Sequence, residues 1–264
     1  MTPSKPAVLF IPGGWHVPAS YSKLTSFLES RGHDVHVPDL PSMNGARPPT
    51  ADLETDTALF REYTQNLADA GRSVVVIVHS YSGQIASNGL AGLGAATRAQ
   101  QGLPGGVVHI ISLCAFILRE GLSMVDVVKH FGQEHLMPLA YDFDDDQTVV
   151  DRYPKVRLVN PDPEDNDEEV EKYLDTLKRW NGKCMYQPLS TDRAAWRDIP
   201  VTYVYTARDM TIPMDYQKWM VETIKQEGAE VETIELDSGH APNFSKAKEV
   251  ADIVDTLVTR YEKE

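Results

Sequence analysis

Short apolar segments alternate along the chain with longer segments whose apolar residues recur at helical spacing. The short segments are rich in β-branched residues, and several are apolar on both faces, which is typical of strands in a covered parallel sheet. They span Ala7 to Ile11, Asp34 to Pro38, Val74 to Val78, Val107 to Phe116, Val201 to Tyr205 and Val231 to Leu236. The chain is therefore predicted to be an α/β protein with a mostly parallel, doubly wound sheet of about six strands.

The intervening segments carry apolar stripes that predict amphipathic helices. The stripes begin at Tyr21, Leu53, Tyr216 and Val250. The first three end at Gly32, Gly71 and Gly228, and glycine suits the left-handed backbone that commonly terminates a helix.

The alternation of strands and helices breaks down between residues 118 and 196. This stretch contains irregular helical pieces, several prolines and a dense acidic run. We interpret it as a helical cap inserted into a core formed by residues 1–117 and 197–264. Residues 142–171 contain 12 Asp or Glu and 3 Lys or Arg, a net charge of −9 that makes up most of the chain's −14.

Composition narrows the classes of partner. The acidic balance disfavours nucleic acid and anionic membranes as partners. The apolar run at the N-terminus is too short for a signal peptide, and no stretch approaches the roughly 18 apolar residues of a membrane span. Cys114 and Cys184 do not form a disulfide framework, and we interpret them as buried thiols. We expect a cytoplasmic protein that acts on a small molecule, and its oligomeric state, which could be a homodimer, cannot be read from the sequence.

The segment VVVIVHSYSG, residues 74–83, contains the strongest chemical signal. An apolar strand leads directly into Ser80, and a helix-compatible segment follows. A serine on such a turn presents its hydroxyl at the carboxyl end of the strand, close to the free amides of the next helix. Ser82 is a competing nucleophile, but it lies further into the helix. The alternative interpretation of Ser80 is a helix cap.

Two later loops supply an acid and a base. Asp209 follows the strand that begins at Val201, and His240 lies in a glycine-flanked loop after the last strand. Serine, acid and histidine in this order is the order of the α/β-hydrolase triad. A serine hydroxyl needs a base to remove its proton, and the base needs a partner that fixes its tautomer. Asp237 is the alternative acid.

The first strand ends in two glycines, which suits a site for a developing oxyanion. Gly14 can offer its backbone N–H, and the N–H of Tyr81 can supply a second donor. A dinucleotide site is not indicated because the spaced third glycine is missing. No cluster of residues has metal-ligand spacing, so we expect neither a metal nor a cofactor.

The motifs PGGWH, VHSYSG, TARDMTIP and SGHAP, in this order, resemble those of compact α/β-hydrolases, the group of plant methylesterases and hydroxynitrile lyases with their bacterial and fungal relatives. The resemblance covers nearly the whole chain and is weakest in the cap. It implies an α/β-hydrolase fold, a triad of Ser80, Asp209 and His240, and an oxyanion hole formed by Gly14 and Tyr81.

The chain departs from this group at a few positions. Pro12 stands where many members have histidine, and Val78 where most have glycine. Hydroxynitrile lyases carry a lysine beside the triad histidine and a threonine at the oxyanion position, whereas this chain has Ala241 and Gly14. These differences favour hydrolysis over cyanohydrin cleavage.

We therefore expect a serine hydrolase that cleaves a small to medium, largely apolar carboxylic ester or lactone through an acyl-serine intermediate. A cofactor-free lyase, cyclase or oxygenase that uses His240 and Asp209 as its base remains an alternative, as does a non-catalytic receptor for a small ligand. The residues expected to line the substrate pocket are Trp15, His16, Phe116, Leu118, Met124, Phe131, Trp180 and Trp196.

Overall fold

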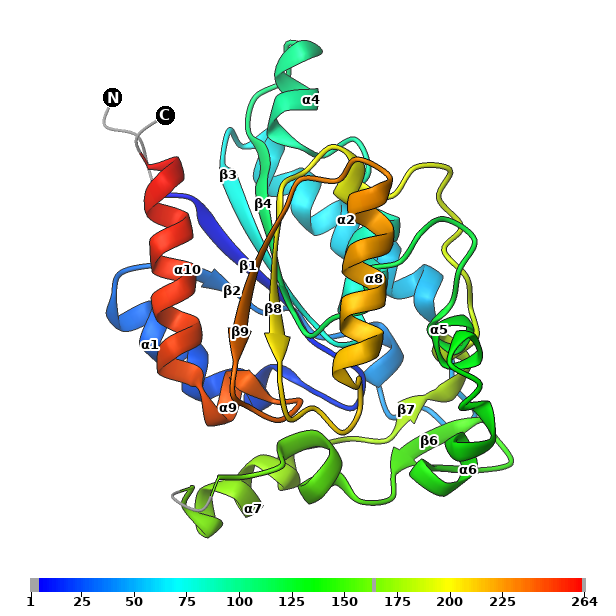
Figure 1. Ribbon diagram of the computed structural model, residues 1–264. Coiled ribbons are helices and arrows are strands. Elements are labelled where there is room, and N and C mark those ends of the chain that lie inside the picture. The colour runs from blue at the N-terminus through cyan, green and yellow to red at the C-terminus, as the bar shows by residue number, and fades with distance from the viewer. Residues whose placement is uncertain (1–4, 163–164, 263–264) are drawn as a thin grey trace.

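A six-stranded parallel sheet forms the centre of the protein (Figure 1). The computed structural model describes residues 5–162 and 165–262. The strands are ordered β2-β1-β3-β4-β8-β9. They span β1 (Ala7–Ile11), β2 (Asp34–His36), β3 (Ser73–His79), β4 (Gly106–Leu113), β8 (Val201–Thr206) and β9 (Val231–Leu236). Every neighbouring pair is parallel, so all six strands end at the same edge of the sheet.

Helices cover both faces of the sheet, as the apolar segments predict. One face packs on α1 (Ser22–Ser30) and α10 (Ala247–Tyr261), and the other on α2 (Leu53–Asp69), α3 (Ser82–Gly89) and α8 (Met214–Gln226). Side chains of β1 alternate between the two cores, with Val8 and Phe10 on one side and Leu9 and Ile11 on the other. Each such fully buried side chain contributes about 1.5–3 kcal/mol.

Several further helical segments are short. They are α4 (Ala95–Gln100), α9 (Pro242–Ser245) and the single turns η1 (Pro18–Tyr21), η2 (Pro41–Met43), η3 (Glu134–Leu136), η4 (Lys155–Val159), η5 (Gly182–Met185) and η6 (Ala195–Arg197). The helix ends agree with the sequence: Asp52 caps α2 by accepting hydrogen bonds from the amides of Glu54 and Thr55. Gly32, which follows α1, has a left-handed φ of 76°.

The middle part of the segment between residues 118 and 196 lies beyond the carboxyl ends of the strands, whereas its last part runs back beside the core (Figure 1). Its helices are α5 (Met124–His130), α6 (Met137–Ala140) and α7 (Asp167–Thr176). It also contains an antiparallel sheet of β5 (Tyr141–Phe143), β6 (Thr148–Asp151) and β7 (Trp180–Asn181). The prediction of a helical cap is therefore right only in part. We use the word cap for residues 118–196.

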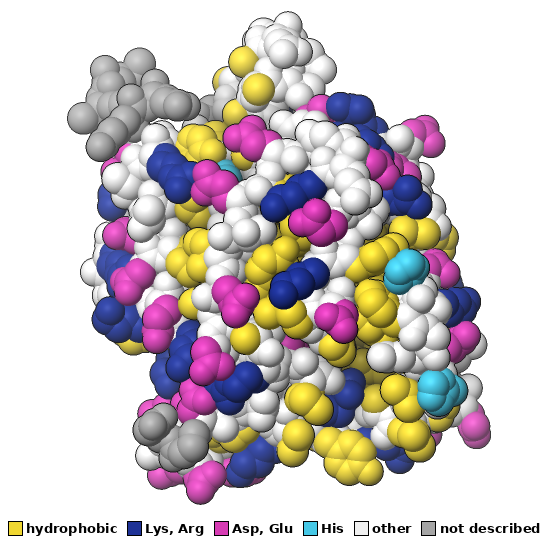
Figure 2. Space-filling model, in the orientation of Figure 1, with side chains coloured by type: hydrophobic (Ala, Val, Ile, Leu, Met, Phe, Trp, Pro, Cys, Tyr) yellow, Lys and Arg dark blue, Asp and Glu magenta, His cyan; other side chains and the backbone are white. Residues whose placement is uncertain are grey.

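Many of the acidic side chains in residues 142–171 form ion pairs. Asp144 and Asp146 both pair with Arg47 of the core, and Asp162 pairs with Arg208 and Lys246. Figure 2 shows acidic and basic side chains interspersed over one face of the molecule. Glu164, which belongs to the same run, lies outside the described residues. No helix among the described residues is both long and apolar enough to cross a membrane.

Candidate active site

Ser80 lies on the sharp turn between β3 and α3. Its φ of 57° is left-handed, a conformation that a non-glycine residue adopts only when the surrounding structure holds it there. Three backbone hydrogen bonds fix the turn: the Ser80 amide donates to the Leu113 carbonyl, and the Ser80 carbonyl accepts from the amides of Gly83 and Phe116. Val78, which replaces the usual glycine of this turn, is buried at the end of β3 without preventing the turn.

Ser80, His240 and Asp209 form a continuous chain of hydrogen bonds. The Ser80 hydroxyl lies 2.9 Å from Nε2 of His240, and Nδ1 of His240 lies 2.8 Å from Oδ2 of Asp209. Each residue follows the carboxyl end of a different strand: β3, β8 and β9. The spacing suits a Ser80 hydroxyl that donates to Nε2 while Nδ1–H donates to the carboxylate.

Asp209 is held by its own loop. Its Oδ1 accepts hydrogen bonds from the amides of Thr211 and Ile212, both at 2.8 Å, and its Oδ2 accepts from the Thr206 hydroxyl at 2.9 Å. By contrast, the Asp237 side chain is 80% exposed and pairs with Arg208. Geometry thus brings Asp209 to the histidine and leaves Asp237 on the surface.

The hydroxyl of Ser82, the competing nucleophile, is engaged by the backbone. Its hydroxyl accepts a hydrogen bond from the His79 amide at 2.7 Å and lies 2.7 Å from the Ile11 carbonyl oxygen, to which it donates. This side chain therefore joins the end of β1 to the turn that carries Ser80.

The loop after β1 passes directly beside Ser80. A Cβ on Gly13 would lie 3.1 Å from the Cβ of Ser80, so only glycine fits there without displacement. Gly14 and Tyr81 are buried, and within the described part of the chain neither of their amides donates to a protein acceptor. Two unused amides beside a serine are what stabilisation of an oxyanion requires.

Three histidines lie in a row behind the site. The rings of His16 and His79 are 5.0 Å apart, and those of His79 and His240 are also 5.0 Å apart. Burial lowers the pKa of His16 to about 3 and that of His79 well below its usual value. His79 accepts from the Tyr21 hydroxyl and donates to the His240 carbonyl, so it supports the histidine loop as a neutral ring.

The cap closes over the site, and Ser80 is only 3% exposed. Its η4 turn packs on the histidine loop so closely that a Cβ on Gly239 would collide with the Val159 carbonyl oxygen. The side-chain amide of Asn160 donates to the Arg208 carbonyl at 2.9 Å. The cap therefore touches the loops of both the acid and the base.

Trp180 of the cap lies against both Gly14 and Tyr81. Ring carbons of Trp180 would lie 2.8 Å from a Cβ on Gly14, and its ring centroid lies 4.6 Å from that of Tyr81. Trp15 packs edge-on against it at 5.3 Å and donates its indole N–H to the Val149 carbonyl of β6.

The other predicted pocket residues lie in several places. The Phe116 amide contacts the turn of Ser80, and His16 bonds the Gly14 carbonyl at 2.6 Å. Trp196 donates to the Leu118 carbonyl at 2.8 Å and packs under Arg197. The core also contains Met124, while Phe131 stacks on Tyr216 of α8 at 4.5 Å. The part of these residues in substrate binding stays a prediction, and Phe131 and Trp196 make the contacts of packing residues.

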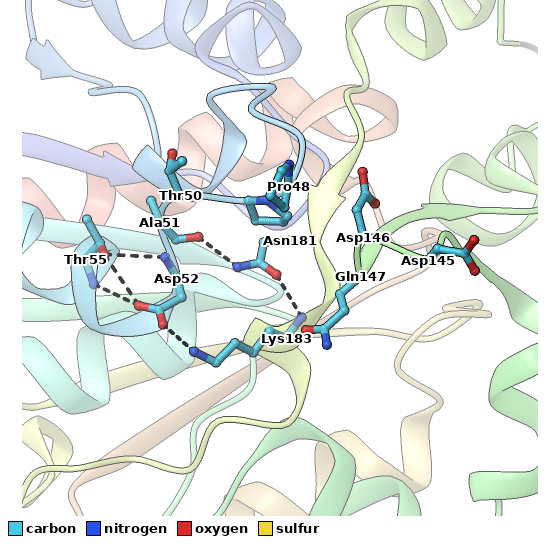
Figure 3. Close-up of a pocket in the computed structure, with 11 residues that line it drawn as sticks. Pro48, Thr50, Ala51, Asp52, Thr55, Asp145, Asp146, Gln147, Asn181 and Lys183 are labelled. Carbon is cyan, nitrogen blue, oxygen red and sulfur yellow. Dashed lines mark hydrogen bonds and ion pairs between the residues drawn. The ribbon is translucent and has the colours of Figure 1, made fainter.

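An open hollow lies at the seam between cap and core rather than at the triad (Figure 3). Its volume is about 460 Å³, and its walls come from residues 48–52, Thr55, residues 145–147, Asn181 and Lys183. Lys183 of the cap pairs with Asp52 at 3.0 Å across this seam, and Asn181 donates to the Ala51 carbonyl at 2.8 Å.

A buried carboxylate close to the site was not predicted from the sequence. Asp56 lies on the buried face of α2, and the Tyr81 hydroxyl donates to it at 2.9 Å. The available signal was its position, three residues after Leu53 and four before Phe60, which places an acid within a predicted apolar stripe. Cys114 was also missed as a neighbour of the triad: its thiol donates to the His240 carbonyl at 3.4 Å.

Comparison with known proteins agrees with this fold. The model of the alpha/beta hydrolase family matches residues 8–253. A probable hydrolase of Phoma sp. is 26% identical over 253 residues, which cover 95% of this chain and 97% of the relative. The chain belongs to the alpha/beta hydrolase family, and the protein is a hydrolase.

Solved structures share the fold at low identity. A pyrethroid hydrolase from Sphingobium faniae matches with a TM-score of 0.72 at 18% identity, covering 97% of this chain and 98% of that one. A methylesterase from Arabidopsis matches with a TM-score of 0.71 at 16% identity, covering 96% and 99%. These similarities confirm the predicted fold and the resemblance to plant methylesterases.

Proposed function

We propose that the protein is a serine esterase that cleaves carboxylic esters or lactones through an acyl-serine intermediate. The observation that carries this proposal is the unbroken chain from the Ser80 hydroxyl through His240 to Asp209, at 2.9 and 2.8 Å. The names of the Arabidopsis methylesterase and of the Phoma hydrolase are in keeping with it.

The two half-reactions use the same residues. His240 takes the Ser80 proton as the oxygen attacks the ester carbonyl, and the amides of Gly14 and Tyr81 receive the developing oxyanion. The protonated His240, held by Asp209, then gives its proton to the leaving alcohol. In the second half-reaction His240 activates water, which releases the acid and restores Ser80.

The surroundings favour a small to medium, largely apolar substrate. Trp15 and Trp180 stand beside the Gly14 amide, and Phe116 adjoins the Ser80 turn. Aromatic walls with few polar groups suit apolar acyl or alcohol groups. The closed cap limits the size of the group that can lie beside the oxyanion hole.

A fluorophosphonate probe tests the proposal directly, because it reacts with serines that are activated by a neighbouring base. Mass spectrometry of the labelled peptide should place the probe on Ser80 and not on Ser82, whose hydroxyl is engaged by the backbone. Ser82→Ala, the matched control, should still be labelled, whereas Ser80→Ala should not. Absence of labelling in the wild-type protein would contradict the proposal, and labelling without turnover of any ester would favour lyase or oxygenase chemistry.

A further inference from the structure

Three donors from two segments converge on the buried carboxylate of Asp56. Its Oδ1 accepts from the Ser42 amide at 2.9 Å, and its Oδ2 accepts from the hydroxyls of Ser42 at 2.6 Å and Tyr81 at 2.9 Å. The side chain is fully buried on α2. An ionised carboxylate matches three donors, whereas a protonated one would add a fourth donor to the same cluster.

The cluster extends into the cap. The indole N–H of Trp180 donates to the Ser42 hydroxyl at 3.1 Å, and the Trp180 ring packs on that of Tyr81. Asp56, Ser42, Tyr81 and Trp180 therefore join α2, η2, the turn of the nucleophile and β7. We call these four residues the Asp56 cluster.

Tyr81 connects this cluster to the chemistry. Its side chain is held by Asp56, and its backbone amide is one of the two unused donors beside Ser80. A donor acts on an oxyanion only when it is aimed at the developing charge, and a misplacement of about 1 Å can reduce a rate about a hundredfold.

We propose that ionised Asp56 is a positioning residue for the oxyanion hole: it fixes the Tyr81 side chain and, through Ser42, the cap residue Trp180. This inference rests on the proposed esterase function and adds a requirement to it. The oxyanion hole is fully formed only while the Asp56 cluster has its acceptor, so activity depends on the ionisation of a group outside the triad.

The surroundings of Asp56 place its titration in an accessible range. Burial raises its pKa to about 6, against the opposing effect of the three donors. Asp52, one turn earlier on α2, adds a smaller upward effect and is itself paired with Lys183. Tyr81, which belongs to the cluster, and the neighbouring Cys184 stay neutral, because burial raises the pKa of both.

Ser42 and Trp180 line a small cavity of about 30 Å³. That space is large enough for about one water molecule beside the Asp56 cluster.

Ionisation of Asp56 should raise activity but lower the stability of the fold. Because the folded pKa lies above the unfolded value of 3.8, the fold favours protonated Asp56. This contribution to stability is present at low pH and is lost as the pH rises from about 4 through about 6. At pH 8 the carboxylate therefore serves the site at the expense of stability, and its removal should reduce activity without lowering the Tm.

The experiment compares the wild-type protein with Asp56→Asn, using hydrolysis of 4-nitrophenyl butyrate from pH 5 to 8. At pH 8 we expect kcat to fall about tenfold or more while KM changes less than about twofold, because the oxyanion hole acts in the transition state. The ratio of wild-type to variant kcat should shrink towards one at pH 5, where wild-type Asp56 is protonated. Taking the ratio removes any pH dependence that the wild-type protein and the variant share.

Three further variants make the test specific. Glu62→Gln removes an exposed carboxylate from the same helix and should leave both constants unchanged. Tyr81→Phe keeps the amide but loses the hydroxyl, so it should reproduce the fall in kcat even if Asp56→Asn does not fold. The double variant Asp56→Asn/Tyr81→Phe should be no worse than either single variant, because both break the same hydrogen bond.

Two results would overturn the inference: a kcat ratio that is the same at every pH, or a loss of activity that follows a loss of Tm. Failure of the proposed function gives a different result, because wild-type Ser80 would then not react with fluorophosphonate, or the wild-type protein would turn over no ester. Reaction at Ser80 together with unchanged kcat in Asp56→Asn would reject this inference and leave the esterase proposal standing.

Discussion

The core and the cap hold their functional side chains by different means. In the core, Ser80, Asp209 and His240 stand on loops at strand ends, where backbone amides such as those of Thr211 and Ile212 fix them. In the cap, Trp180 and η4 reach the site through a few side-chain hydrogen bonds and close packing on Gly14 and Gly239. We therefore expect substitutions of Ser80, Asp209 or His240 to remove activity, whereas substitution of Trp180 should change selectivity.

The largest expected effect is that of Ser80→Ala. Loss of the nucleophile should reduce kcat for 4-nitrophenyl butyrate by at least about 10³-fold, because single triad deletions usually cost several orders of magnitude. The Tm should stay within about 2 °C, since the backbone of the turn is unchanged. Retention of more than about a tenth of the rate would show that Ser80 is not the nucleophile.

Asp209→Asn should come next, with a fall in kcat of about 10³- to 10⁴-fold, because an amide favours the wrong histidine tautomer. The matched control is Asp237→Asn, which neutralises an exposed acid on a nearby loop and should change kcat less than about twofold. Parallel kinetics on the two variants check the assignment, and the opposite ranking would move the acid to position 237.

Two buried tryptophans of the cap, Trp180 and Trp196, distinguish an effect on substrate selectivity from an effect on packing. Trp180→Leu should raise the kcat/KM ratio of 4-nitrophenyl octanoate to 4-nitrophenyl acetate about tenfold, because it opens space beside Gly14. Trp196→Leu also creates a cavity, but its contacts are with Leu118 and Arg197, so this ratio should change less than about twofold. Equal changes in both variants would mean that Trp180 affects selectivity only through stability.

The smallest expected effect concerns substrate charge. The acidic run of the cap predicts that a neutral ester is preferred over a matched ester with a free carboxylate. Because Arg47, Arg208 and Lys246 pair with much of that run, we expect a preference of only about twofold in kcat/KM at low salt. The preference should narrow as salt shortens the Debye length, which is about 10 Å at 0.1 M. A preference that salt does not change would exclude the acidic run as its source.

The sequence predicts the core well because its signals are local. The bounds of β1 and β9 agree with the prediction. The three residues of the proposed triad meet through hydrogen bonds because each follows the end of a strand. The predicted fourth strand runs too far, to Phe116, because β4 ends at Leu113, where Cys114 turns the chain with a φ of 37°. Apolar character alone could not reveal that turn.

The cap was harder to predict because its elements depend on tertiary contacts. Strands β5, β6 and β7 have three, four and two residues, too few for an alternating pattern to emerge. The role of Asp56 was not predicted for a related reason. It depends on hydrogen bonds from Ser42 and Tyr81, which are distant from Asp56 in the sequence.

The row of histidines has a consequence for charge during the reaction. In the proposed reaction His240 receives the proton of Ser80, and the neighbouring imidazoles of His79 and His16 do not accept it, because burial keeps both rings neutral. His79 and His16 therefore do not conduct the proton away from His240. The positive charge stays between Asp209 and the substrate, and the departing alkoxide becomes the acceptor best placed to collect it.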